Sequence, residues 1–168
     1  EFPLRLVGSE MCIRDSLDSD GDIDVIVGDY SGKLHYLENS SSNPGIFNLT
    51  IGSSPMSDIL NNIFDFGFSS HPTLFDIDND NDLDIIIGES SGNLNYVENI
   101  GDSLIFNFNL RSENLGGVEV SQWWTNIGFS APVLHYNGSN LELYVGSKSG
   151  AIFKYLSLIH ISEPTRRR

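Results

Sequence analysis

A repeat with a period close to 60 residues constrains the fold of this chain more than any other feature. The segment DIDVIVGDYSGKLHYLEN at 22–39 aligns with DLDIIIGESSGNLNYVEN at 82–99, which lies 60 residues further on. A third copy, LELYVGSKSGAIFKYL at 141–156, follows at nearly the same distance, because Gly146 lies 58 residues after Gly88. Such a period indicates an array of one supersecondary unit, in which neighbouring units bury a shared core.

Each copy has the composition of short β-strands. Runs rich in Ile, Val, Phe and Tyr are bounded by Gly, Asn, Asp and Ser, and no window of ten residues has helical periodicity. The run IIIG, which ends at Gly88, is expected in an inner strand that is buried on both faces. The segments 53–62 and 112–122 interrupt the pattern and are predicted to be loops between strands or at a sheet edge. The strands predicted for the second copy are 72–76, 83–88, 93–98 and 104–110.

About four strands in each unit favour a β-propeller, whose blades are four-stranded sheets. The predicted fold class is therefore all-β: an incomplete propeller of about two and a half four-stranded blades of roughly 60 residues each. A β-sandwich of unrelated strands is the alternative, but it leaves the period unexplained. Two and a fraction repeats cannot close a ring, so we expect unpaired strand edges and self-association.

Two segments at the ends of the chain are expected not to belong to the repeat region. LVGSEMCIRDS at 6–16 and LSLIHISEPTR at 156–166 share no similarity as peptides, yet one DNA strand read in opposite directions can encode both. That DNA resembles a transposon-end adapter used to prepare sequencing libraries. Residues 1–16 and 156–168 are therefore expected to be translated adapter, which leaves 17–155 as the repeat region. The alternative, a natural N-terminal arm and a basic tail, does not account for the shared DNA.

The repeat region, 17–155, is strongly acidic. It contains four basic and 19 acidic residues, for a formal charge of −15, against −14 for all 168 residues. Such a charge excludes ordinary binding to nucleic acid or to anionic membranes, because both need basic residues. No apolar run approaches the roughly 20 residues needed to span a bilayer, so membrane insertion is not expected. The charge suits a protein that binds cations.

The strongest functional motif is FDIDNDNDLDIIIG at 75–88, where aspartate occupies every second position before the apolar run. Carboxylates about 4 Å apart repel each other by roughly 4 kcal/mol at an effective dielectric constant near 20, so the loop needs a compensating cation or full solvation. Oxygen ligands at alternate positions can surround one calcium ion, which takes six to eight oxygens. The ligands predicted here are the carboxylates of Asp76, Asp78, Asp80 and Asp84 and the carbonyl oxygen of Asp82.

The first copy carries the same acidic pattern at the same phase, which predicts a second calcium site. Its sixth loop position is Gly, and that of the second copy is Asn, the residue types that best accept left-handed backbone. Its first position falls on Ser16, inside the segment expected to be adapter. The ligands predicted for this site are Asp18, Asp20, Asp22 and Asp24.

The third copy departs from the acidic pattern. HYNGSNLE at 135–142 is shorter by two residues and keeps only Glu142 at the place of Asp84. A plain hairpin without a metal ion is therefore expected there.

The acidic loops allow two other interpretations. An EF-hand is rejected because the sixth position counted from Asp78 is Leu83, where that loop needs Gly, and because the flanking residues are β-type. Aspartates that only solubilise a surface turn are the simpler explanation for a single loop. Two loops at the same phase, each followed by an apolar strand and Gly, favour metal binding.

The pattern D-x-D-x-D-x-x-x-D, followed by three apolar residues and Gly at this spacing, resembles the FG-GAP/VCBS repeats of integrin-α-like propellers. Such repeats also occur in bacterial secreted and surface proteins. The resemblance covers most of 17–155 and is specific at both acidic loops. It implies calcium held in a loop between strands of one blade, and an extracellular or cell-surface location. The integrin ligand-binding surface has no recognisable counterpart here, so adhesion does not follow from the resemblance alone.

The sequence thus predicts a calcium-stabilised propeller portion of a secreted or cell-surface protein. It is expected to be an interaction or adhesion scaffold with an unidentified protein or carbohydrate partner, and not an enzyme. The alternative is the propeller portion of an extracellular polysaccharide-degrading enzyme, because propellers host both roles.

His35, His71 and His135 show no metal-ligand spacing and are interpreted as strand or loop residues. Trp123 and Trp124 are the best candidates to stack on a ligand, with packing against the sheet as the simpler alternative.

Overall fold

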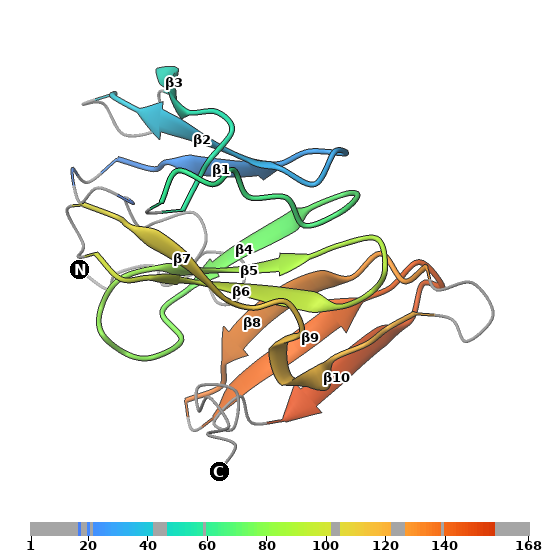
Figure 1. Cartoon of the computed structure of the whole chain (residues 1–168). Coiled ribbons are helices and arrows are strands. Elements are labelled where there is room, and N and C mark those ends of the chain that lie inside the picture. The colour runs from blue at the N-terminus through green and yellow to red at the C-terminus, as the bar shows by residue number, and fades with distance from the viewer. Residues whose placement is uncertain are drawn as a thin grey trace, which may run out of the picture.

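The computed structural model shows an all-β protein, as the sequence predicts (Figure 1). Ten strands form three antiparallel sheets, and a short 3-10 turn, η1 at Leu115–Gly117, is the only helical segment in the described part of the chain. No helix in that part is long and apolar enough to cross a membrane. The described residues are 17, 20, 22–41, 47–58, 60–101, 105–121, 127–138 and 140–156. The predicted adapter segments therefore lie outside them, except that Leu156 is the last residue of the final strand.

Each sheet is a meander in which consecutive strands pair antiparallel. The first sheet has the order β1–β2–β3, the second β4–β5–β6–β7 and the third β8–β9–β10. We call the three stretches of chain that form them the first, second and third units. The strands are β1 Val25–Gly28, β2 Leu34–Asn39, β3 Leu49–Ser53, β4 His71–Phe75, β5 Asp84–Gly88, β6 Leu94–Asn99, β7 Phe108–Ser112, β8 Ala131–Tyr136, β9 Leu141–Gly146 and β10 Ile152–Leu156.

The second sheet has the four strands that the sequence predicts, and three of them begin and end within one residue of the predicted bounds. The last strand, β7, begins at Phe108 instead of residue 104. The side chain of Asn99 explains the difference, because its oxygen accepts hydrogen bonds from the backbone N–H groups of Gly101 (3.1 Å) and Asn107 (2.8 Å). These bonds hold the chain in a loop just before the strand.

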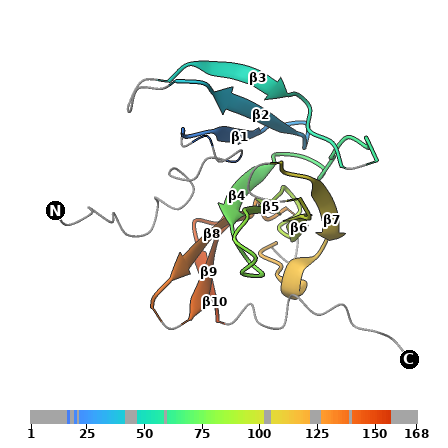
Figure 2. The same cartoon turned by 90° about the vertical axis from the view of Figure 1, so that its left-hand side faces the viewer.

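The second sheet lies between the other two, and its inner strand β5 is buried on both faces (Figures 1 and 2). Ile85 and Ile87 on β5 face the first sheet, and Ile86 between them faces the third, because side chains alternate along a strand. All three are fully buried. The prediction that this apolar run forms an inner strand is therefore confirmed.

The 60-residue period of the sequence is also a period of the packing between sheets. The N–H of Ser70, just before β4, donates to the carbonyl of Asp29 in the β1–β2 turn at 3.1 Å. Sixty residues later the N–H of Ser130, just before β8, donates to the carbonyl of Glu89 in the β5–β6 turn at 3.0 Å. Each sheet is thus joined to the next by the same backbone contact.

Glycine at the end of β1 and β5 makes this close approach possible. A Cβ atom on Gly28 would lie 2.1 Å from the carbonyl oxygen of Ser70, and one on Gly88 would lie 2.1 Å from that of Ser130. Any side chain would force the sheets apart, since carbon and oxygen do not approach so closely without a bond.

The loops predicted between strands are found there, and they also contribute to the core. The connection from β3 to β4 buries Met56, Phe64 and Phe66 between the first and second sheets. The connection that follows β7 buries Leu115 and Val118 between the second and third sheets. The sequence pattern does not predict this contribution, because the segments lack strand periodicity.

Candidate metal site

The acidic loop of the second unit joins β4 to β5, so it lies between strands of one sheet, as predicted. Carboxylate oxygens of Asp76, Asp78 and Asp80 all lie within 4.8 Å of one another. Asp76 is half-buried, and the other two are exposed. Three carboxylates this close can bind a single hard cation between them.

The loop backbone curls around the first carboxylate of the motif. Asp76 accepts hydrogen bonds from the N–H groups of Asp80 and Asn81, both at 3.2 Å. Asn79 and Asn81 have left-handed backbone, with φ of 62° and 74°. The left-handed turn predicted at Asn81 is therefore confirmed, and asparagine tolerates it because its short polar side chain costs less there than a branched one.

Asp82 is the least satisfied group of the loop. Its N–H donates to Asp80 at 3.1 Å, while its side chain is buried, with 7% of the residue exposed. Its Oδ1 atom is buried without a hydrogen-bond partner. Burial, followed by the negative charge of Asp80, raises the pKa of Asp82 well above its usual range. A carboxylate in this state destabilises the fold unless a cation approaches it.

Asp78 responds to the same crowding. Although Asp78 is exposed, partial desolvation of its carboxyl group is the first cause that raises its pKa, and the charge of Asp80 is the second. None of the ion pairs described in the structure involves a carboxylate of this loop; the nearby Glu98 is paired with Arg111 instead. The loop therefore lacks a positive charge of its own.

Asp84 lies outside the cluster formed by the first three aspartates. It is 1% exposed and accepts three hydrogen bonds: from Asn99 N–H (2.8 Å), Ile77 N–H (3.1 Å) and the Tyr96 hydroxyl (3.1 Å). Burial nevertheless raises the pKa of Asp84 to about 7. The side chain thus ties the start of the loop to the end of β6, and its predicted role as a metal ligand stays a prediction.

The first unit repeats this tie. Asp24 is buried and accepts hydrogen bonds from Leu17 N–H at 3.0 Å and Asn39 N–H at 2.9 Å. Leu17 and Asn39 lie 60 residues before the corresponding donors of the second unit. The last aspartate of each motif, Asp24 or Asp84, is therefore a structural anchor at the same place.

The acidic loop of the first unit is described only in part. The N–H of Asp22 donates to Asp20 at 2.8 Å, which repeats the contact between Asp82 and Asp80. Asp18 lies outside the described residues, so the structure gives no geometry for a complete second site. The four ligands proposed for this loop stay a prediction.

The third unit replaces the acidic loop by a hairpin, as predicted. Strands β8 and β9 pair up to the turn, where the N–H of Asn137 donates to the Asn140 carbonyl at 3.1 Å. Glu142 here contacts Lys154 at 2.9 Å and accepts hydrogen bonds from Asn137 and Tyr144, both at 2.7 Å. The pKa of Glu142 is lowered to about 2, chiefly by the bond with Lys154.

A second polar cluster, in the first unit, was not predicted from the sequence. Nδ1 of His35 lies 2.6 Å from the Ser54 hydroxyl, and its Nε2 lies 3.0 Å from the carboxylate of Asp29. The same carboxylate accepts bonds from the N–H of Lys33 and the hydroxyl of Ser31 within the β1–β2 turn. The hydrogen bond with His35, together with that from Lys33, holds the pKa of Asp29 well below its usual range.

This cluster resembles a serine–histidine–aspartate array in composition, but it fits turn stabilisation better. The carboxylate corresponding to Asp29 is Glu89, which caps the next turn in the same way by accepting a hydrogen bond from Asn93 N–H at 3.3 Å, as Asp29 does from Lys33 N–H. The residues GESSG at 88–92 also match the pattern G-x-S-x-G. They form a turn between two antiparallel strands, whereas a nucleophile elbow joins a strand to a helix.

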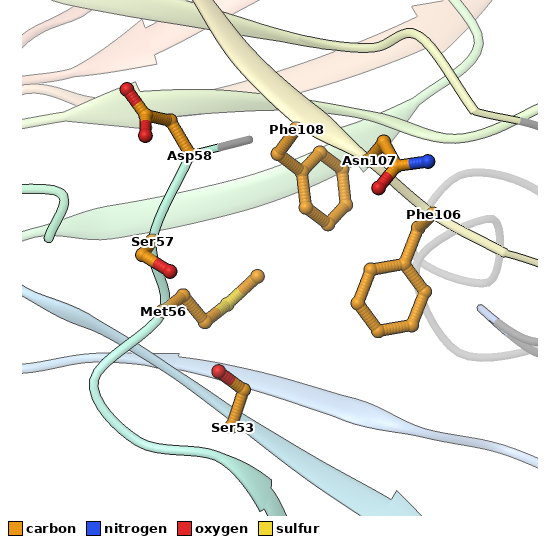
Figure 3. A pocket seen from close by; sticks show the side chains of 7 residues that line it. All are labelled: Ser53, Met56, Ser57, Asp58, Phe106, Asn107 and Phe108. Atoms are coloured by element: carbon orange, nitrogen blue, oxygen red, sulfur yellow. The ribbon is translucent and has the colours of Figure 1, made fainter. Parts of the chain in front are cut away.

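A small cavity lies where the β3–β4 connection meets the start of β7 (Figure 3). Its volume is about 80 Å³, and Met56, Phe106 and Phe108 provide the apolar part of its lining. A space of this size holds a few water molecules and is well below the roughly 300 Å³ of an ordinary ligand pocket. Trp123 and Trp124, the predicted stacking residues, lie outside the described residues.

Comparison with known protein families, with curated proteins and with solved structures finds no match for this chain. The geometry of the acidic loop is therefore the observation on which a function rests. That loop brings three of the nine predicted metal ligands together in one cluster.

Proposed function

We propose that this chain is a calcium-stabilised β-propeller module of the FG-GAP/VCBS type, from a secreted or cell-surface protein. The observation that carries the proposal is the loop of the second unit. Asp76, Asp78 and Asp80 converge within 4.8 Å, and the buried Asp82 beside them leaves one oxygen without a partner. Oxygen-only ligands of high negative charge suit calcium better than softer metals.

The packing of the sheets supports the propeller part of the proposal. Each sheet is a meander, as a propeller blade is, and successive sheets are joined by the same contact. Strand β4 lies beside both β1 and β8, so one edge of the second sheet touches its neighbours on either side. This is the arrangement expected of inner strands around a common axis.

Calcium in this module has a structural role. It neutralises carboxylates that otherwise repel one another, so its binding free energy stabilises the folded state. Extracellular calcium modules commonly bind with dissociation constants of about 0.1–1 mM. The proposed biological role is that of an interaction or adhesion scaffold for a protein or carbohydrate partner, without a catalytic function.

The test is the melting temperature of the whole chain in calcium-free buffer and in millimolar calcium. Calcium is expected to raise it, and Asp80→Ala to remove most of the rise, because Asp80 belongs to the cluster and also bonds the N–H of Asp82. Glu113→Ala is the matched control: it removes one exposed carboxylate outside the loop and should leave the response intact. A melting temperature that does not change with calcium would refute the proposal.

A further inference from the structure

A single basic side chain lies close to the acidic loop of the second unit. Arg111 is the only lysine or arginine in the sequence from 34 to 147. It is the residue of β7 left between the partners of Tyr96 and Val97, where the register of the two strands shifts. Such a bulge adds one residue to a strand and redirects its side chain. The guanidinium group forms an ion pair with Glu98 on β6.

Glu98 lies beside the buried end of the acidic loop. Ile85 on β5 pairs with Val97 on β6. One position further in the same register, Asp84 lies opposite Glu98 on the same side of the sheet. The N–H of Asn99, the next residue of β6, donates to the Asp84 carboxylate at 2.8 Å. The ion pair is therefore adjacent to the loop.

The charges of the loop and of the ion pair act on one another. The hydrogen bond with Glu98 raises the pKa of Arg111, and the charge of Asp78 adds to this rise. The pKa of Asp78 is raised by desolvation, then by the charge of Asp80, and also by that of Glu98. The side chain of Arg111 is 49% exposed, so it can turn towards the loop without leaving water.

The repeat itself does not require an arginine at this place. The first sheet has the same irregularity, between Tyr36 and Leu37 on β2, and Gly52 occupies there the position that Arg111 has in the second sheet. Pairing of the last two strands thus proceeds with or without the basic side chain. The position of Arg111 beside the acidic loop indicates an electrostatic role.

The third unit shows a basic side chain that reaches the acidic position directly. Lys154 contacts Glu142 there at 2.9 Å, and no row of aspartates precedes that glutamate. In the second unit the arginine contacts Glu98, and none of the ion pairs in the described residues involves a loop aspartate.

We propose that Glu98 holds Arg111 away from the acidic loop and so keeps the loop open for a metal ion. Without Glu98, the guanidinium group turns to Asp78, the exposed loop carboxylate nearest to it in electrostatic effect. It then competes with the ion, because both bind carboxylate oxygens. The effect on the ion rests on the calcium binding proposed above, whereas the placement of Arg111 does not.

The first test is the calcium affinity of the full chain, from the dependence of its melting temperature on calcium concentration. Arg111→Gln removes a repelling charge and should bind calcium more tightly. Glu98→Gln frees the guanidinium group and should bind calcium more weakly. Each change is expected to be about tenfold, the effect of one unit charge near a divalent ion at the protein surface.

The variant that carries both changes separates this role from direct coordination by Glu98. It lacks the competing arginine, so its affinity should return to about that of the unaltered chain. A double variant that binds as weakly as Glu98→Gln would show that Glu98 is itself a ligand, and would overturn the proposal. An Arg111→Gln variant with weakened binding would also overturn it.

Two control variants make the same changes of charge elsewhere. Glu119→Gln alters an exposed carboxylate at the other end of β6, where Glu119 pairs with Asn93. Lys33→Gln removes a basic side chain from the β1–β2 turn. Both should leave the calcium affinity unchanged, and a tenfold change in either would show that net charge alone accounts for the effects.

The second test needs no calcium. In calcium-free buffer, Asp78→Asn should raise the melting temperature of the unaltered chain, because it relieves repulsion between carboxylates. In the Glu98→Gln background it should lower the melting temperature, because Asp78 is then the partner of Arg111. With both Glu98 and Arg111 replaced, it should raise it again.

The two tests separate this proposal from the proposed calcium site. The same sign for Asp78→Asn in all three backgrounds would overturn the placement of Arg111, whether or not the chain binds calcium. A reversal of sign in a chain that does not respond to calcium would support that placement and refute the calcium site alone.

Discussion

The second and third units hold an acidic side chain at the same place in opposite electrostatic states. In the second unit, burial raises the pKa of Asp84 to about 7. In the third unit, the contact with Lys154 lowers the pKa of Glu142 to about 2. The repeat keeps the hydrogen-bonding role of the carboxylate in both, but only the third unit supplies a positive charge from its own chain.

This difference explains why the acidic loop of the second unit lowers the stability of the fold, whereas the hairpin of the third unit does not. At the position of Lys154 the second unit has Tyr96, which donates a hydrogen bond to Asp84 but carries no charge. Four further aspartates precede Asp84, and none of them has a basic partner in the described structure. A bound divalent cation would neutralise the carboxylates of the second unit, as Lys154 neutralises Glu142 in the third.

The largest effect is expected from Asp84→Ala. It removes the acceptor of two backbone N–H groups and of the Tyr96 hydroxyl, in a site with almost no access to water. Each buried donor left unpaired costs about 1–3 kcal/mol, so the free energy of unfolding should fall by about 3 kcal/mol or more. Urea denaturation with and without calcium measures it.

Glu142→Ala is the matched variant in the third unit. Its loss should be smaller, because Lys154 and Asn137 are exposed and can bond to water instead. Asp84→Asn should lower the free energy of unfolding by an amount between those of Asp84→Ala and Glu142→Ala, since asparagine keeps one oxygen acceptor. Equal losses for the two alanine variants would show that the two carboxylates are held alike, contrary to the comparison.

The sequence predicts the parts of this comparison that depend on local pattern. The alternate aspartates predict the cluster of Asp76, Asp78 and Asp80, and the asparagine at the sixth position predicts the left-handed turn. The period of 60 residues predicts repeated β units of four strands each, and the described residues form three antiparallel sheets, of which only the second has four strands. In each case the relevant residues are close in the chain or repeat at a fixed distance.

The sequence does not predict contacts that depend on strand register. Lys154 reaches Glu142 because β9 and β10 pair in one register, and Asn99 reaches Asp84 across β5 and β6. The burial of Asp82 likewise depends on the folded conformation of the loop and not on the local pattern. These contacts decide which carboxylates are satisfied, so the sequence alone cannot separate a metal ligand from a structural anchor.

The pH dependence of stability is expected to differ with and without calcium. A carboxyl group whose pKa is raised by folding stabilises the fold below its ordinary pKa near 4, and this contribution is lost as the pH rises through the raised value. In calcium-free buffer the melting temperature should therefore fall between about pH 5 and pH 7, through Asp84 and Asp82. Calcium should abolish most of this fall, because it favours the ionised carboxylates.

Asp82→Asn sharpens the same measurement. Asparagine cannot ionise, so the decline in calcium-free buffer should become shallower, while the calcium response weakens. Glu142 cannot produce the decline, because its lowered pKa gives stability that is lost only at acid pH, from about 4 down through 2. A melting temperature that rises steadily from pH 5 to pH 7 without calcium would show that Asp82 and Asp84 do not cause the expected fall.

The smallest effect is expected from Lys154→Gln, which removes the internal cation of the third unit. Glutamine keeps a hydrogen-bond donor near Glu142 but not the charge, so the pKa of Glu142 should rise from its lowered value. Lys154 is open to solvent, with 43% of its side chain exposed, and an ion pair with an exposed partner contributes little to stability. The melting temperature at neutral pH should therefore drop less than in Asp84→Ala, with an unchanged response to calcium. A variant that acquired a new calcium response would show that the third unit, once deprived of Lys154, needs an external cation as the second unit does.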